Sequence, residues 1–230
     1  AQGMVLVRTV DGKLTALNAS DGDLRWTYDR TVPVLTLRGT SPPVITDDMV
    51  ISGFDGGRLV AVDLQDGQTV WERRVAIPSG RTELERLVDI DAEPQVRDGT
   101  VYVATFQGRV AAIDAANGEV IWRRDMSSHA GVGIDEDRVY VTDERSHVWA
   151  LDRENSASVW RQKELEFRSA TSPRRFGSHV VVADLEGYVH LLDEADGRIS
   201  GRTRVGSAPV YAPPLVGDGL IYIYSSDGTL

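Results

Sequence analysis

Residues 65–71 read QDGQTVW, and close variants of this phrase recur along the chain. The copies are ASDGDLRW ending at Trp26, AANGEVIW ending at Trp122, ENSASVW ending at Trp160, and EADGRIS, after which Gly201 stands where the tryptophan should be. A phrase that returns at regular intervals marks a repeated structural unit, so this repeat decides the fold.

Each copy closes a longer block made of an apolar run, a polar turn and a second apolar run. VISGFDGGRLVAVDLQDGQTVW, at 50–71, contains all of these parts. The turn between the two runs ends in glycine in five blocks and in serine in one, and it advances by 45, 51, 38, 41 and 41 residues. A spacing near forty residues is typical of one four-stranded propeller blade.

The residues within the blocks favour short strands. Val, Ile, Leu and Tyr dominate the runs, Gly, Asp and Asn separate them, and helical periodicity is absent. A further short strand is expected before each block, as in PPVITDD and PQVRDGT, giving four strands per unit. We therefore predict an all-β chain, a β-propeller of four-stranded antiparallel blades with five to six units visible. The expected boundaries within this single domain, 1–230, are roughly 1–40, 41–90, 91–130, 131–168, 169–210 and 211–230.

The repeated tryptophans and acids have structural interpretations. A large ring at the same place in each blade buries much area against a neighbouring blade, so we predict structural roles for Trp26, Trp71, Trp122 and Trp160. The acid that ends the third strand of most blocks is placed to accept hydrogen bonds from turn amides. The chain starts close to a strand and stops inside a sixth copy, which suggests either part of a longer propeller or a missing closing partner.

Composition limits the possible functions. A formal net charge of −10 argues against nucleic acid as a partner, because a duplex binder needs a concentrated basic face. The absence of cysteine excludes disulfides, thiolate metal sites and cysteine nucleophiles. No stretch approaches the ~20 apolar residues of a membrane-spanning helix. The first residues, AQGMVLVRTV, lack the regions of a signal peptide, so nothing in the chain is expected to target or anchor it.

Enzyme motifs are missing. The four histidines are scattered without metal-ligand spacing, and His147 and His190 are expected to be ordinary sheet residues. No nucleophile elbow, phosphate-binding loop or dinucleotide fingerprint is present. We therefore expect no catalytic residue, no metal and no cofactor.

Two segments interrupt the repeat, and such interruptions map to loops that often form a binding face. The longer is IPSGRTELERLVDID at 77–91, whose TELERLVD portion could form a short helix. The other is TVPVLTLRG at 31–39, in which Leu35 and Leu37 share one side of an extended segment. These leucines could enter the core of an ordinary connection, or they could form an interface anchor flanked by Arg38.

Asp89 and Asp91 also allow more than one interpretation. DIDAEP offers alternating carboxylates for calcium, but Pro94 stands where a calcium loop needs glycine. The two acids could be turn residues that precede a new strand. They could also orient the loops or pair with basic groups of a partner protein.

The pattern A-x-D-x-x-D/N-G-x-x-x-W, matched by IDAANGEVIW at 113–122 with the preceding alanine, resembles the repeat of pyrroloquinoline-quinone enzymes. Three further stretches resemble the BamB family, namely VPVLTLRGTSPPV at 32–44, GRTELERLVDIDAEPQV at 80–96 and the segment 168–197. This resemblance implies an eight-bladed propeller lipoprotein on the periplasmic face of the outer membrane. Its lipid-bearing cysteine would lie outside this chain.

The resemblance also implies a function. Members of the family are non-catalytic subunits of the β-barrel assembly machinery that bind the POTRA domains of BamA and assist outer-membrane protein folding and insertion. They associate with the other subunits indirectly. Contact with unfolded outer-membrane proteins is a further expectation. VLTLRG matches the family's partner-binding loop, so the implied partner-binding residues are Leu35, Leu37, Arg38, Arg86, Asp89 and Asp91. A fragment of a quinone-dependent dehydrogenase and a periplasmic propeller with another protein partner remain as alternatives.

Overall fold

The computed structural model describes residues 2–30, 41–77, 81–82 and 87–230. All regular elements of this described part are β-strands, which confirms the all-β prediction. Of the short helix expected around 82–89, residues 83–86 lie outside the described part, and the described residues on either side are not helical. None of the described residues forms a helix with the length and apolar character needed to span a bilayer.

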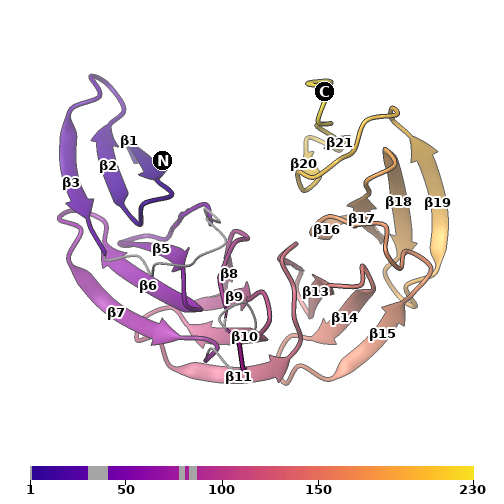
Figure 1. Cartoon of the computed structure of the whole chain (residues 1–230), viewed down its shortest axis with the longest axis horizontal. Helices are drawn as coiled ribbons and strands as arrows, with labels where there is room; N and C mark the ends of the chain where they lie inside the picture. Colours follow the sequence, from indigo (N-terminus) through magenta and orange to yellow (C-terminus); the bar gives the residue numbers. More distant parts are fainter. Residues whose placement is uncertain (1, 31–40, 78–80, 83–86) are drawn as a thin grey trace. The chain divides into compact units, whose positions relative to one another are not determined.

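The strands form antiparallel sheets that follow one another along the chain, each strand pairing with the next (Figure 1). Residues 1–129 form one compact unit with three of these sheets. The first sheet contains β1 (Met4–Arg8), β2 (Leu14–Asn18) and β3 (Leu24–Tyr28). The second contains β4 (Val44–Ile45), β5 (Met49–Phe54), β6 (Arg58–Asp63) and β7 (Thr69–Arg74). The third contains β8 (Gln95–Arg97), β9 (Thr100–Ala104), β10 (Arg109–Asp114) and β11 (Val120–Asp125).

Residues 130–230 form a second compact unit built in the same way. The fourth sheet contains β12 (Val132–Ile134), β13 (Arg138–Thr142), β14 (Val148–Asp152) and β15 (Ser158–Gln162). The fifth contains β16 (Arg174–Phe176), β17 (His179–Ala183), β18 (Tyr188–Asp193) and β19 (Ile199–Arg204). The sixth contains β20 (Leu215–Gly217) and β21 (Leu220–Tyr222). Successive four-stranded sheets of this kind are propeller blades, as the repeat predicted.

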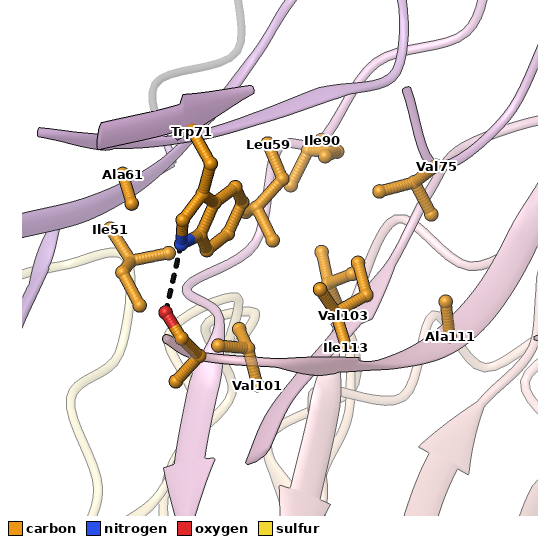
Figure 2. Packing of buried hydrophobic residues seen from close by; sticks show 11 residues of the cluster. Ile51, Leu59, Ala61, Trp71, Val75, Ile90, Val101, Val103, Ala111 and Ile113 are labelled. Atoms are coloured by element: carbon orange, nitrogen blue, oxygen red, sulfur yellow. Dashed lines mark hydrogen bonds between the residues drawn. The ribbon is translucent and has the colours of Figure 1, made fainter. Parts of the chain in front are cut away.

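Within each unit, the repeated phrase joins a sheet to the one before it. Trp71, on β7, donates a hydrogen bond from Nε1 to the carbonyl of Ala115 in the third sheet, over 2.8 Å (Figure 2). Its ring lies against Gly118, where an added Cβ would come within 2.7 Å of the indole. Gly118 also has a φ of +72°, which glycine adopts without strain. The DG turn of one sheet therefore receives the tryptophan of the preceding sheet.

The same contact recurs in both units. Trp26 donates to the carbonyl of Leu64 and lies against Gly67, and Trp160 donates to the carbonyl of Glu194 and lies against Gly197. All four tryptophans of the repeat are between 6% and 9% exposed. Between consecutive sheets of a unit, interlocking aliphatic side chains such as Ile51, Leu59 and Ile113 are fully buried (Figure 2). Each such side chain stabilises the fold by roughly 1.5–3 kcal/mol.

In five sheets, the two strands that flank the DG turn pair a small residue with a large one. Alanine stands opposite the tryptophan in four sheets, at Ala16, Ala61, Ala112 and Ala150. In the fifth sheet the sizes are exchanged, because Leu191 stands opposite Gly201. A cavity of about 380 Å³ lies beside this pair and is also lined by Val205, Ile221 and Ile223.

Strand direction divides each sheet into two ends. Because the strands alternate, the turn between the second and third strands and the connection to the next sheet leave the same end, which we call the connection end. In the second sheet this end carries the turn 55–57 and the connection 75–94. The DG turns lie at the opposite end. The described part of the interruption at 77–91 therefore belongs to the connection end.

Candidate functional site

The described part of the long connection runs across the connection end of the second sheet. Asp89 forms an antiparallel bridge with Asp55, in the turn between β5 and β6. The carbonyl of Asp89 accepts a hydrogen bond from the amide of Phe106 in the third sheet, over 2.9 Å. Ser41 donates its hydroxyl to the carbonyl of Ala92, over 2.8 Å. The segment 87–92 is thereby fixed on the sheets below it.

Two glycines allow this close approach. A Cβ at Gly53 would lie 2.2 Å from the side chain of Ile90, and a Cβ at Gly57 would lie 2.8 Å from that of Val88. Gly57 has in addition a φ of +66°, a conformation that other residues adopt only with strain. These two positions therefore need glycine because the connection packs directly on the backbone of the second sheet.

The turn between β5 and β6 differs from its counterparts. In three other sheets a residue with a side-chain oxygen begins this turn and accepts a hydrogen bond from the amide that ends it. The pairs are Thr105 with Arg109, Asp143 with His147, and Asp184 with Tyr188, over 2.6, 2.9 and 3.1 Å. Phe54 stands at this position in the second sheet and is only 2% exposed. This turn cannot be capped by its own first residue.

Asp89 supplies the missing cap from the connection. Its Oδ1 accepts a hydrogen bond from the amide of Gly56 over 3.0 Å, and the residue is only 2% exposed. A buried carboxylate that accepts a backbone amide is stabilised by that bond. Asp89 therefore orients the connection on the turn.

Asp91 lies two residues further along and has a different environment. It is partly buried, and its Oδ1 is shielded from solvent without a hydrogen-bond partner among the described residues. Burial raises the pKa of Asp91 to about 6, with further contributions from the charges of Asp89 and Asp55. A carboxylate in this state gains free energy from any cation that approaches it.

Asp55 completes a group of three carboxylates, which we call the acidic trio (Asp55, Asp89 and Asp91). Burial raises the pKa of Asp55, Asp89 raises it further, and the positive charges of Arg8 and Arg30 oppose the rise. Arg8 stacks on the ring of Phe54, with its guanidinium carbon 4.3 Å from the ring centre. The attraction of Arg8 and Arg30 thus acts on the pKa of Asp55. The pKa of Asp91 is instead raised by burial and by its two acidic neighbours.

The trio is suited to receive a basic group. Across the described residues, no set of three or more His, Asp or Glu side chains converges in a way that could hold a metal ion. A guanidinium or ammonium group from another molecule would fit the chemistry better, because one hydrogen-bonding cation could use the free oxygen of Asp91.

The structure brings together two of the predicted partner-binding residues, Asp89 and Asp91, and gives them different surroundings. Leu35, Leu37, Arg38 and Arg86 lie outside the described residues. Sequence reasoning missed Asp55, Arg8 and Arg30. The only sequence signal was local, namely a phenylalanine followed by DGG at 55–57, where the other turns begin with an oxygen-bearing residue.

The two histidines expected on strands both bind aspartates. His190 lies on β18, and its Nε2 is 2.7 Å from Oδ2 of Asp184. His147 lies in the turn directly before β14, so its placement on a strand was wrong, and its Nδ1 is 3.1 Å from Oδ2 of Asp143. The turn holds His147 in this position because the His147 amide donates a hydrogen bond to Oδ1 of the same aspartate.

Comparison with known proteins gives one consistent match. The family model described as outer membrane protein assembly factor BamB matches residues 1–162 and 163–230. The assembly factor BamB of Pseudomonas aeruginosa is 46% identical over 202 residues, covering 88% of this chain and 53% of that protein. BamB of Yersinia pestis is 36% identical over 230 residues, covering 100% of this chain and 58% of that protein. The chain thus spans little more than half the length of these relatives.

Solved structures agree with the sequence match. The crystal structure of BamB from Moraxella catarrhalis superimposes with a TM-score of 0.91 at 30% identity, covering 98% of this chain and 68% of that one. A europium-containing methanol dehydrogenase superimposes with a TM-score of 0.70 at 13% identity, covering 90% of this chain and 50% of that one. The second likeness shows a shared fold alone.

Proposed function

This chain belongs to the BamB family of outer membrane protein assembly factors, and from that premise we propose that it is a non-catalytic accessory of the β-barrel assembly machinery. It acts on the periplasmic side of the outer membrane and docks onto the POTRA domains of BamA. The connection ends of its first-unit sheets form the docking face. Their rigid sheets hold the contact residues in place before the partner arrives.

One observation carries the proposal, namely that Oδ1 of Asp91 has no hydrogen-bond partner among the described residues and lies beside two other carboxylates. A buried oxygen without a partner costs free energy in the isolated protein. A basic side chain of the partner removes that cost on binding and also relieves the repulsion from Asp55 and Asp89. Such a pair gives specificity, because a partner without the cation would leave the carboxylate buried and unpaired.

The remaining family contacts are assigned to the two interruptions of the repeat. Leu35 and Leu37 would supply apolar contacts, and Arg38 and Arg86 would supply charged contacts at their edge. Assistance to unfolded outer-membrane proteins and anchoring through a lipid outside this chain follow from the same family relationship. Fold likeness to a dehydrogenase at 13% identity does not favour catalysis over this assignment.

Calorimetric titration of the protein with the soluble POTRA domains of its cognate BamA tests the proposal. Asp91→Asn keeps the size of the side chain but removes its charge, and we expect it to weaken binding about tenfold or more. Asp98→Asn is the matched control. Its side chain is 68% exposed, and φ is +48°, a conformation that asparagine tolerates. Binding by this control should stay within about twofold of the original.

The titration separates two failures. Absence of binding by the unmodified protein would remove BamA as the partner and leave the acidic trio without an assigned ligand. Equal binding by the protein and by Asp91→Asn would keep the partner and move the contact away from Asp91. At pH 5 the affinity should fall, because protonated Asp91, with a pKa of about 6, no longer attracts a cation.

A further inference from the structure

A second surface, rich in arginine and aromatic side chains, lies at the connection end of the fifth sheet. Its members come from three segments of the second unit: the connection before β16, strand β18 and strand β19. They are Phe167, Arg168, Tyr188, Arg202 and Arg204, and we call them the arginine–aromatic surface. None of these residues belongs to the acidic trio or to the interruptions at 31–39 and 77–91.

The arginines of this surface gather around one ring. The guanidinium carbons of Arg168, Arg202 and Arg204 lie 5.6, 5.1 and 5.4 Å from the centre of the Tyr188 ring. Tyr188 pairs directly with Arg204 across the two strands, so both side chains project from the same face of the sheet. Three cations around one ring is an unusual concentration in a chain with a net charge of −10.

The neighbouring carboxylates are used by only one of the three arginines. Nε of Arg168 lies 2.6 Å from Oδ2 of Asp184, and its Nη2 lies 3.0 Å from Oε2 of Glu186. Asp184 is completely buried, so it cannot reach toward solvent. In the described part of the chain, Arg202 and Arg204 have no carboxylate within ion-pair distance, and both are exposed. Their guanidinium forks are therefore available for an external anion.

Phe167 precedes Arg168 in the chain and adds an exposed apolar group to this surface. It is 74% exposed, and its φ of +62° is a conformation that bulky residues rarely adopt. The strained backbone is held on both sides, because the amide of Phe167 donates to the carbonyl of Arg145 over 2.9 Å and Arg168 is fixed by its two carboxylates. A strained, exposed aromatic residue that the surrounding bonds hold in place points to a functional contact.

From these contacts we propose that the arginine–aromatic surface binds an extended acidic protein segment that carries an apolar side chain. Arg202 and Arg204 are two residues apart on one strand, so they repeat at about 6.5–7 Å, the distance between alternate side chains of any extended peptide. Carboxylates at alternate positions of the segment would each take one guanidinium fork. Phe167 would contact the apolar side chain next to them. Arginine and aromatic residues are the types enriched at such protein contacts.

The net charge of the protein favours a short segment over a large anionic surface. A nucleic acid or an anionic bilayer presents many charges over a wide area, and these would be repelled by the other acidic residues of the chain. A single segment meets only the local positive charge. The occupant inferred here is thus a protein segment, and a lipid surface becomes an alternative outcome of the test.

Fluorescence anisotropy with short labelled peptides tests this assignment. The probe has two aspartates at alternate positions followed by leucine, and matched probes replace the aspartates by asparagine or the leucine by serine. Arg202→Gln combined with Arg204→Gln should weaken binding of the first probe about tenfold. Arg198→Gln is the control, because this arginine precedes the same strand and its side chain is 87% exposed. It should bind within about twofold of the unmodified protein.

Phe167→Ser tests the apolar contact separately. This variant should weaken binding of the leucine probe by about fivefold and leave binding of the serine probe unchanged. All variants are compared by thermal unfolding, so that loss of binding is not confused with loss of fold. Equal binding of the aspartate and asparagine probes, or full binding by the double arginine variant, would overturn the proposal. Binding to phosphatidylglycerol vesicles that requires both arginines, without binding of the peptide, would reassign the surface to lipid phosphates.

Discussion

The connection ends of the second and fifth sheets place carboxylates in opposite circumstances. In the fifth sheet, Asp184 accepts bonds from the amides of Glu186 and Tyr188, from Arg168 and from His190, over 2.6 to 3.1 Å. Burial alone would raise the pKa of Asp184, but the bonds from His190 and Arg168 outweigh it and hold the pKa well below its usual range. In the connection that follows the second sheet, Oδ1 of Asp91 has no partner within the described part of the chain, and the pKa of Asp91 is raised.

This contrast separates carboxylates that stabilise the fold from a carboxylate that we propose to bind a partner. A carboxylate with every oxygen satisfied fixes the connection to the following turn and has nothing left to offer a partner. A carboxylate left unsatisfied destabilises the free protein and gains free energy when a cation arrives. Sites that cost stability in this way are commonly functional. The same substitution should therefore have opposite effects at the two positions.

The largest effect is expected from Asp184→Asn. The neutral amide no longer balances Arg168, which keeps a charge beside a buried polar group, and His190 loses its acceptor. We expect the free energy of unfolding to fall by about 3 kcal/mol. Urea denaturation at pH 7.5 measures this change. A loss below about 0.5 kcal/mol would mean that the network of Asp184 contributes no more than a surface ion pair.

Asp91→Asn should change stability in the other direction. The variant removes a charge that burial and two neighbouring carboxylates disfavour, so the free energy of unfolding should rise by about 1–2 kcal/mol at pH 7.5. The same denaturation experiment detects it. A clear destabilisation by Asp91→Asn would place Asp91 among the structural carboxylates and erase the contrast with Asp184.

The gain from Asp91→Asn should depend on pH. The pKa of Asp91 is raised in the folded protein, so its favourable contribution is complete below about pH 4, where an unfolded aspartate is also protonated. That contribution is lost as the pH rises through the folded value of about 6. The difference between the variant and the original protein should thus be near zero at pH 4 and largest above pH 7. A difference independent of pH would show that the effect is not electrostatic.

Asp89 should respond to the shape of its replacement more than to its charge. Asp89→Asn keeps an oxygen that can accept from the amide of Gly56, so its stability should change little. Asp89→Ala removes the cap and should lower the free energy of unfolding by about 1–2 kcal/mol. Comparison of the two variants by thermal unfolding isolates the capping bond. Equal losses in both would indicate that the charge of Asp89, and not its hydrogen bond, holds the connection.

The smallest effect is expected from Phe167→Gly in the second unit. Glycine relieves the left-handed backbone but increases the freedom of the unfolded chain, so the net gain in stability should be roughly 0.5 kcal/mol. Differential scanning calorimetry measures the shift in Tm. A marked loss of stability would show that the exposed ring packs on its surroundings and is not held out for a partner.

Much of the fold was predictable from the sequence because its determinants are local. The DG turn favours glycine because this position has a positive φ, and the alanine that faces each tryptophan stands ten residues before it, from Ala16 and Trp26 to Ala150 and Trp160. The exchange at Leu191 and Gly201 follows the same spacing and could have been read. These features depend on hairpin register, which the turn itself fixes.

The sites were less predictable because they join segments that are distant in the sequence. The proximity of Asp55 to Asp89 depends on the path of the connection over Gly53 and Gly57, which no local pattern specifies. Hairpin register alone could have paired Tyr188 with Arg204. It could not have shown that Arg168 reaches the Tyr188 ring from the connection. Nor could it have shown that Arg168 binds both Asp184 and Glu186.

The contact that Trp26, Trp71 and Trp160 each make with the glycine turn of the next sheet gives folding a direction. A newly completed sheet presents an uncovered indole, and only the following sheet, made later by the ribosome, can cover it. During synthesis from the N-terminus, the most recently folded sheet would therefore expose an apolar indole. Chaperones could bind this indole until the next hairpin covers it. At Gly201 no ring is passed on. Among the described residues, the fifth and sixth sheets therefore pack through a cluster without tryptophan, which includes Val181, Phe176 and Ile221, so this junction should open before those that a tryptophan closes.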